Sequence, residues 1–189
     1  MKSIKKGCVG YIKSRRIKYL MITLLLLGGD LFMFFYAKWY FGSNKNLFSL
    51  FAALICLPIA KTAVETIMLF RARGCSEEAE KQITQHKGSV DGLFELYLTS
   101  YSNSFQLSHV AYACGNVIAY TELAGTKGNL GEKHIREILS NNGFKGYNVK
   151  IFYNLDKYIE RLDSLNRLKE QGEEEDLSGL GDVLLSISL

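Results

Sequence analysis

Apolar side chains are concentrated in two long runs near the start of the chain. The first run spans residues 19–41 and the second spans residues 47–70, and a short polar segment, residues 42–46, separates them. At about 1.5 Å per helical residue, each run reaches about 34 Å, which is enough to cross a hydrocarbon core of about 30 Å. The first run is longer than the apolar part of a signal peptide, and a second run follows it. The pattern therefore predicts an antiparallel transmembrane hairpin over residues 19–70.

Shorter segments follow the hairpin, and their apolar residues recur with the period of a helix in some and of a strand in others. Ser76 with three glutamates close behind is typical of a helix N-terminus, because a capping hydroxyl and acidic residues suit the free N–H groups there. Gly115-Asn116 between two apolar runs indicates a tight β-hairpin. The expected order over residues 76–171 is α-β-β-β-α-β-α, with helices at 76–87, 129–143 and 154–168 and strands at 93–101, 107–114, 117–123 and 148–153. We therefore predict a membrane α-helical hairpin followed by one α/β domain, with residues 172–189 as an acidic linker and an apolar C-terminal tail.

Charge is distributed unevenly along the chain and predicts its orientation. Residues 1–75 carry twelve Lys or Arg against Asp30 and Glu65, a net +10, whereas residues 76–189 carry eleven against seventeen acidic residues, a net −6. Residues 1–18 form a basic juxtamembrane segment without an acidic residue, and the positive-inside rule places both termini of a two-pass protein in the cytoplasm. We expect a protein of the cell membrane whose basic segment contacts anionic lipid headgroups through Lys2, Lys5, Lys6, Lys13, Arg15, Arg16 and Lys18.

Three ionisable residues, Asp30, Lys61 and Glu65, lie within the predicted spans. A lone charge at the centre of a bilayer costs at least about 2.5 kcal/mol, so such residues are rare there. Counted from the turn, Asp30 and Lys61 differ in depth by only about 4.5 Å, which a lysine side chain covers. The sequence predicts an internal Asp30–Lys61 bridge, with Glu65 reaching the inner headgroups. The alternative is an ion or proton path, or a polar contact with a partner membrane protein.

The soluble part shows no motif that carries a known reaction. Its glycines match neither a P-loop nor a dinucleotide-binding pattern, and neither a GxSxG elbow nor an HExxH motif is present. The cysteines have no CxxC spacing and the histidines fall on different predicted elements; these residues are Cys8, Cys56, Cys75, Cys114, His86, His109 and His134. We therefore predict no metal and no cofactor, and we lean against an enzyme. Since the domain is acidic, we expect no nucleic-acid partner.

The predicted order αβββαβ is also that of the restriction-endonuclease-like core. Enzymes with that core hold a metal with an acid on the second strand and an E-x-K or Q-x-K on the third. Here the third predicted strand reads VIAYTE at residues 117–122, with no lysine two positions after an acid, and the second reads SHVAYA at residues 108–113. A hard divalent cation would lack its oxygen ligands. A nuclease-like domain in this chain would therefore be degenerate or remote.

Five segments spread over nearly the full length carry a second resemblance. They are KKGCVGYIKSRR (residues 5–16), GSNKNLFSL (42–50), LICLPIAK (54–61), EKHIREIL (132–139) and KIFYNLDKYIERLDSLN (150–166). Through them the chain resembles an uncharacterised family of small bacterial two-transmembrane-helix membrane proteins with a cytoplasmic α/β domain. The resemblance implies this architecture and implies no reaction.

Three functions are compatible with these patterns. The first is a membrane-anchored protein that presents a cytoplasmic α/β interaction domain to a protein partner or to copies of itself. The second is a membrane-tethered hydrolase, most simply a remote nuclease-like domain. The third is a small subunit of a membrane complex that uses Asp30, Lys61 and Glu65 as intramembrane contacts. A pocket that gathers acidic residues around His109 would favour the hydrolase.

Overall fold

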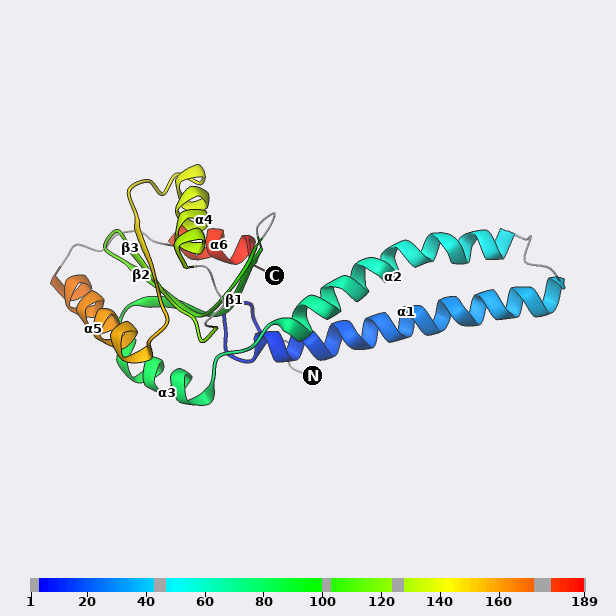
Figure 1. Cartoon of the computed structure of the whole chain (residues 1–189), viewed down its shortest axis with the longest axis horizontal. Coiled ribbons are helices and arrows are strands. Elements are labelled where there is room, and N and C mark those ends of the chain that lie inside the picture. The colour runs from blue at the N-terminus through cyan, green and yellow to red at the C-terminus, as the bar shows by residue number, and fades with distance from the viewer. Residues whose placement is uncertain (1–3, 43–46, 100–102, 124–127, 172–177, 189) are drawn as a thin grey trace. The chain divides into compact units, whose positions relative to one another are not determined.

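The computed structural model describes residues 4–42, 47–99, 103–123, 128–171 and 178–188, and it consists of two compact units (Figure 1). The hairpin unit comprises Ile12–Ala72, and the α/β unit comprises Met1–Tyr11 together with Arg73–Leu189. Most of the predicted polar connector, Lys2 and the acidic run at residues 173–176 lie outside the described residues. The expectations for them stay predictions.

Two long helices form the hairpin unit, α1 (Tyr11–Phe41) and α2 (Leu47–Arg71). Both are long enough and apolar enough to span a membrane, and only 11% of the most apolar 18-residue window of each is buried. The core helix of a water-soluble domain buries most of such a window, whereas these helices leave it exposed. The helix α1 begins ahead of the predicted apolar run, because the Lys and Arg residues that precede the run are good helix formers. The prediction of two long apolar helices is confirmed.

The α/β unit follows the predicted order of elements and adds one helix. Its elements are α3 (Glu77–His86), β1 (Asp91–Thr99), β2 (Ser104–Ala113), β3 (Asn116–Tyr120), α4 (Gly128–Asn141), β4 (Asn148–Phe152), α5 (Leu155–Gln171) and α6 (Ser178–Ser186). The strands form one sheet in the order β1-β2-β3-β4, in which β1, β2 and β3 are antiparallel neighbours and β4 runs parallel to β3. The parallel pair follows from the crossover through α4. The predicted α/β class is confirmed, and the apolar C-terminal tail forms α6.

Helices cover both faces of the sheet (Figure 1). On one face Ile135 and Leu139 of α4 pack with Leu180 and Leu184 of α6 against β1, β2, β3 and β4. On the other face α3 and α5 form a second core, centred on the fully buried Tyr158. Because β2 lies between both cores, nearly all of its side chains are buried. The unit therefore has three layers, α/β/α.

The tight turn between β2 and β3 lies at Cys114-Gly115, one residue before the predicted position. Ala113 pairs with Asn116, which leaves Cys114 and Gly115 as the turn residues, with φ angles of 46° and 69°. Two left-handed residues match the twist of the flanking strands. The Asn116 side-chain Nδ2 donates to the Cys114 carbonyl at 2.7 Å, so Asn116 supports the turn from the first position of β3.

Segments from both ends of the chain protect the free edge of β1. The Phe94 backbone N–H donates to the Gly7 carbonyl at 2.8 Å, and Leu98 forms an antiparallel bridge with Ser188. Lys6 Nζ donates to the Ser188 carbonyl and links the two protecting segments. An uncovered edge strand is a template for pairing with other chains. Here part of the basic N-terminal segment occupies that edge and belongs to the α/β unit.

Candidate functional site

Three polar residues of α1, spaced seven apart, contact α2 within the hairpin unit. The Arg16 guanidinium donates through Nε to the Leu69 carbonyl (3.2 Å) and through Nη2 to the Ala72 carbonyl (2.7 Å). The last carbonyls of a helix lack helical partners, so Arg16 satisfies the end of α2. Thr23 Oγ1 lies 3.1 Å from Thr66 Oγ1, and Asp30 is the third member. Residues spaced seven apart lie on the same side of a helix, so these three side chains all face α2. We call Arg16, Thr23 and Asp30 the polar ladder.

Asp30 does not form the predicted bridge with Lys61. The Cys56 thiol donates to Asp30 Oδ2 over 3.6 Å, and Asp30 Oδ1 has no hydrogen-bond partner among the described residues, although the side chain is only 8% exposed. Ile59 is a buried residue of α2, and Lys61 follows it by two positions. At about 100° per residue, Lys61 points about 200° away from Ile59. The predicted bridge is wrong because matching depth along two helices does not place both side chains on facing sides.

Lys61 and Glu65 lie one turn apart on a flank of α2 away from the ladder. Lys61 is exposed and Glu65 is half-buried. Within the described parts of the chain, no ion pair joins either residue to another side chain. Leu57 and Val64, on the same flank, are more than half exposed. The structure therefore places two opposite charges in an otherwise apolar, uncovered surface.

Of the seven basic residues expected at lipid headgroups, the six that the structure describes divide into two groups. Lys5, Lys13 and Lys18 have exposed side chains. The other described members donate hydrogen bonds within the chain: Lys6 to Ser188, Arg16 to the end of α2, and Arg15 Nη1 to the Tyr19 hydroxyl at 2.9 Å. Lys2 lies outside the described residues. Among the described members, the fully exposed cationic side chains are therefore those of Lys5, Lys13 and Lys18.

Two buried polar side chains of the sheet hold the segments on either side of the hairpin. Glu95 Oε1 on β1 accepts the Gly10 backbone N–H at 3.0 Å. Gln106 on β2 binds both backbone groups of Arg73: Oε1 accepts the N–H at 2.8 Å and Nε2 donates to the carbonyl. Both side chains are 5% exposed. Since Gly10 directly precedes α1 and Arg73 closely follows α2, one sheet holds the chain where it leaves the α/β unit and where it returns. We call these four residues the clamp.

The backbone of β1 is distorted where Glu95 takes part in the clamp. Glu95 has a φ of 55°, in the left-handed region that costs a non-glycine residue roughly 1–2 kcal/mol. Leu93 and Leu96 both face the core formed with α4 and α6, whereas a regular strand places alternate residues on one face. The alternation therefore shifts by one residue at Glu95. The sequence feature that could have indicated this distortion is Glu95 itself, a single acidic residue within an apolar strand.

The thiol of Cys75 is unreactive in its surroundings. Burial raises the pKa of Cys75 to about 12, and the nearby carboxylates of Glu122, Glu80 and Glu95 add to the shift. At neutral pH the thiol is protonated, whereas a nucleophilic cysteine needs its thiolate. Glu122 has a structural contact of its own, because its Oε1 accepts from the backbone N–H (3.1 Å) and the hydroxyl (2.8 Å) of Ser76, the N-cap of α3.

His109 is buried in the core between the sheet and α5. Its Nδ1 lies 2.6 Å from the Tyr158 hydroxyl, and its Nε2 has no partner among the described residues. A Cβ on residue 92 would lie 2.6 Å from that Nε2, so the His109 ring fits here because residue 92 is a glycine. Burial lowers the pKa of His109 to about 3, and the positive charge of Lys87 adds to the shift. His109 is therefore a neutral core residue, without access for a substrate.

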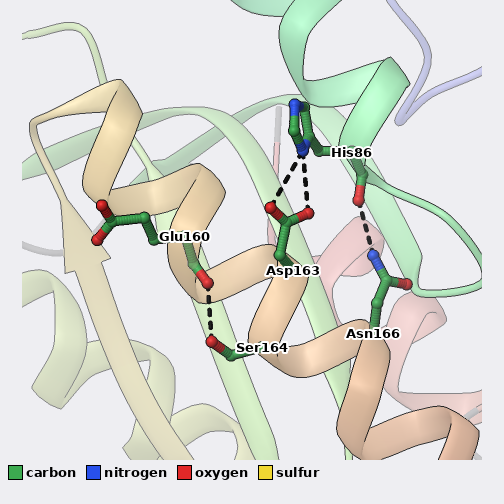
Figure 2. Close-up of polar contacts among 5 residues, drawn as sticks. All are labelled: His86, Glu160, Asp163, Ser164 and Asn166. Atoms are coloured by element: carbon green, nitrogen blue, oxygen red, sulfur yellow. Dashed lines mark hydrogen bonds and ion pairs between the residues drawn. The ribbon is translucent and has the colours of Figure 1, made fainter.

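His86 forms a histidine–carboxylate pair at the surface, where α3 meets α5 (Figure 2). Its Nδ1 lies 3.0 Å and 3.1 Å from the two carboxylate oxygens of Asp163, and Asn166 Nδ2 donates to the His86 carbonyl at 2.7 Å. The nearby Ser164 hydroxyl donates to the Glu160 carbonyl of its own helix, so it is not placed as a nucleophile for His86. These contacts dock the C-terminal end of α3 on α5.

The three histidines thus occupy separate places, since the His134 ring packs at a tilt against the Phe105 ring, with 5.8 Å between the ring centroids. Among the residues that the structure describes, no group of three or more His, Cys, Asp or Glu side chains is arranged to hold a metal ion. The polar arrangements that involve the hairpin or the chain next to it are the ladder, the clamp and the Lys61–Glu65 flank. Comparisons of the chain with protein-family models, with curated proteins and with solved structures find no match.

Proposed function

We propose that this chain is a two-pass protein of the cell membrane whose termini and α/β unit are cytoplasmic, and that the α/β unit is an interaction domain. The observation that carries the proposal is the exposure of α1 and α2: both are long and apolar, yet only 11% of each apolar window is buried. In water such a surface would drive aggregation, whereas in a bilayer it is the favoured surface.

The orientation rests on the basic residues. Lys5 precedes α1 in the sequence, Lys13 and Lys18 lie in the first part of α1, and all three side chains are exposed; Arg71 is the last residue of α2. Basic residues next to a span favour the cytoplasmic side and attract anionic headgroups by about 1 kcal/mol each.

The state of the polar residues favours an interaction domain over an enzyme. His109 is buried and neutral, Cys75 is a protonated thiol, and the carboxylate of Asp163 is paired with His86 without a placed nucleophile. Through Glu95 and Gln106, the clamp holds Gly10, which precedes α1, and Arg73, which follows α2, on the same sheet. Such a domain is suited to present its surface near a membrane.

Cysteine labelling tests the topology. In a chain without its native cysteines, a thiol at Ser43→Cys in the connector should react with a membrane-impermeant maleimide added to intact cells. A native Cys8 retained alone, which is exposed in the α/β unit, should react only after the cells are opened. A chain labelled at Cys8 in intact cells would have the opposite orientation, and a chain released from membranes by alkaline carbonate would not be membrane-inserted.

A remote nuclease-like hydrolase is the second candidate. It is favoured by the strand order β1-β2-β3-β4 with antiparallel and parallel pairs, and by Glu122, which follows the end of β3. Against it, Glu122 is bound to Ser76 and the unit carries a net negative charge. A polyanionic substrate would be repelled.

We expect the full-length protein in detergent to leave supercoiled plasmid and single-stranded RNA intact in the presence of Mg²⁺ or Mn²⁺. Gel electrophoresis of the nucleic acids, with a chelator-treated sample as control, measures the outcome. Metal-dependent cleavage that Glu122→Gln abolishes and Glu137→Gln retains would overturn the interaction-domain proposal. Glu137 is a suitable control because it is exposed on α4.

A further inference from the structure

The outer flank of α2 has the residue pattern of a helix-dimer seam. Leu54, Leu57, Lys61, Val64 and Met68 follow one another at alternating intervals of three and four residues, the spacing at which two helices supercoil. Leu54, Leu57 and Val64 are more than half exposed, so the described parts of the chain leave this stripe uncovered. We call these five residues the outer stripe. It is distinct from the buried positions Ile59 and Thr66 of α2.

Lys61 lies deep within α2, about 15 Å along the helix from Arg71 and about 21 Å from Leu47. If α2 spans a bilayer, as proposed above, the ammonium group is too far from either end to be solvated without cost, which amounts to about 2.5–3.5 kcal/mol. The Asp30 carboxylate is not its partner, because that side chain is buried and contacts Cys56. The other acidic residue of the hairpin unit is Glu65.

Glu65 carries the complementary charge one turn away, at the edge of the outer stripe. The order of Lys61 before Glu65 is the less favourable one for a pair within a helix, and the two residues form no such pair among the described contacts. Each helix thus offers one positive and one negative group to a neighbour.

We propose that the outer stripe is the interface with a second copy of this chain. A two-fold axis along the membrane normal would bring two α2 helices together in parallel, with Lys61 of each copy reaching Glu65 of the other. The interface is self-complementary, because one patch supplies both members of both ion pairs. A single lysine in an otherwise apolar seam also selects the register and the number of helices.

A second copy accounts for both charges at once. A partner protein would need an acid and a base of its own at matching depth, whereas the two-fold arrangement leaves neither charge of this chain unpaired. The proposal rests on the membrane insertion proposed above, since in water these charges need no partner.

Cross-linking in liposomes of phosphatidylethanolamine and phosphatidylglycerol tests the interface with the full-length chain. In a background without native cysteines, Leu57→Cys places a thiol in the stripe, and oxidation should give a disulfide-linked dimer at a low ratio of protein to lipid. Adding Lys61→Glu alone, or Glu65→Lys alone, should lower the dimer fraction about tenfold, because four like charges then meet. The matched charge reversal Lys38→Glu on α1 should leave the dimer fraction unchanged.

Complementation between two charge variants distinguishes a second copy of this chain from any other partner at the outer stripe. When the Lys61→Glu chain and the Glu65→Lys chain carry tags of different size and are mixed, the mixed dimer should recover to the original level while each variant alone stays low. One chain that carries both substitutions should also recover. Unchanged cross-linking of the single variants, or failure of the mixture to recover, would overturn the interface. Retention after alkaline carbonate is measured in parallel: release of the original chain refutes membrane insertion, whereas retention without a dimer refutes the interface alone.

Discussion

Between pH 6.5 and pH 3, the free energy of unfolding of the α/β unit is expected to fall by up to about 4 kcal/mol through His109 alone. The ordinary pKa of histidine is 6.5, and burial together with Lys87 lowers the pKa of His109 to about 3 in the folded chain. Between these values the unfolded chain binds a proton that the folded chain does not. Stability therefore rises with pH through this window and falls as the pH is lowered, and the contribution levels off below pH 3.

Denaturant unfolding of the full-length protein in detergent, followed by circular dichroism between pH 3 and pH 8, measures this slope. Carboxyl groups titrate in the same window, so the comparison is between variants. His109→Leu in a Tyr158→Phe background removes both members of the buried hydrogen bond, and it is compared with Tyr158→Phe alone. As the pH falls below 6.5, the free energy of unfolding of Tyr158→Phe should fall relative to that of the double variant. Parallel curves would show that His109 binds its proton over the same pH range in the folded chain as in the unfolded chain. His134→Leu is the control for a half-buried histidine.

Leu184→Ala is expected to lower the free energy of unfolding of the α/β unit by about 2–5 kcal/mol. Leu184 is fully buried in the core that α6 shares with β1 and β2, so the truncation removes apolar contacts and leaves a cavity. Leu168→Ala on α5 is the matched control, because that leucine is 42% exposed and should lose less than about 1 kcal/mol. The midpoints of denaturant unfolding measure both effects. An equally small loss for Leu184→Ala would mean that α6 is not part of the core.

The hairpin and the order of the strands were predictable because they depend on local periodicity. Two apolar runs predict two long helices whatever else the chain does, and Gly115-Asn116 between two apolar runs indicates a tight turn, which lies within one residue of that position. Boundaries were less well predicted. The start of α1 at Tyr11 follows from local helix propensity that the apolar pattern does not report, and the folding of the C-terminal tail as α6 depends on packing partners that lie far away along the sequence.

The sequence singled out three residues of the hairpin as candidates, but it did not predict how their side chains are arranged. Asp30, Lys61 and Glu65 stood out because charges are rare in apolar runs, but depth along the helices does not tell which flank a side chain occupies. The clamp was missed, since an isolated polar residue in a strand does not tell which backbone group it binds, and Gly10 and Arg73 lie far from Glu95 and Gln106 along the sequence.

The sequence by itself therefore determined the two apolar helices, the α/β class and the asymmetry of charge, because each follows from the spacing and type of neighbouring residues. Only the tertiary structure decided that Asp30 contacts Cys56, that Lys61 points outward, and that Lys6 and Arg16 bind carbonyl groups within the chain. Each of these depends on the rotation of one element against another. A rotation of 100° per residue turns a difference of two positions into opposite faces of a helix.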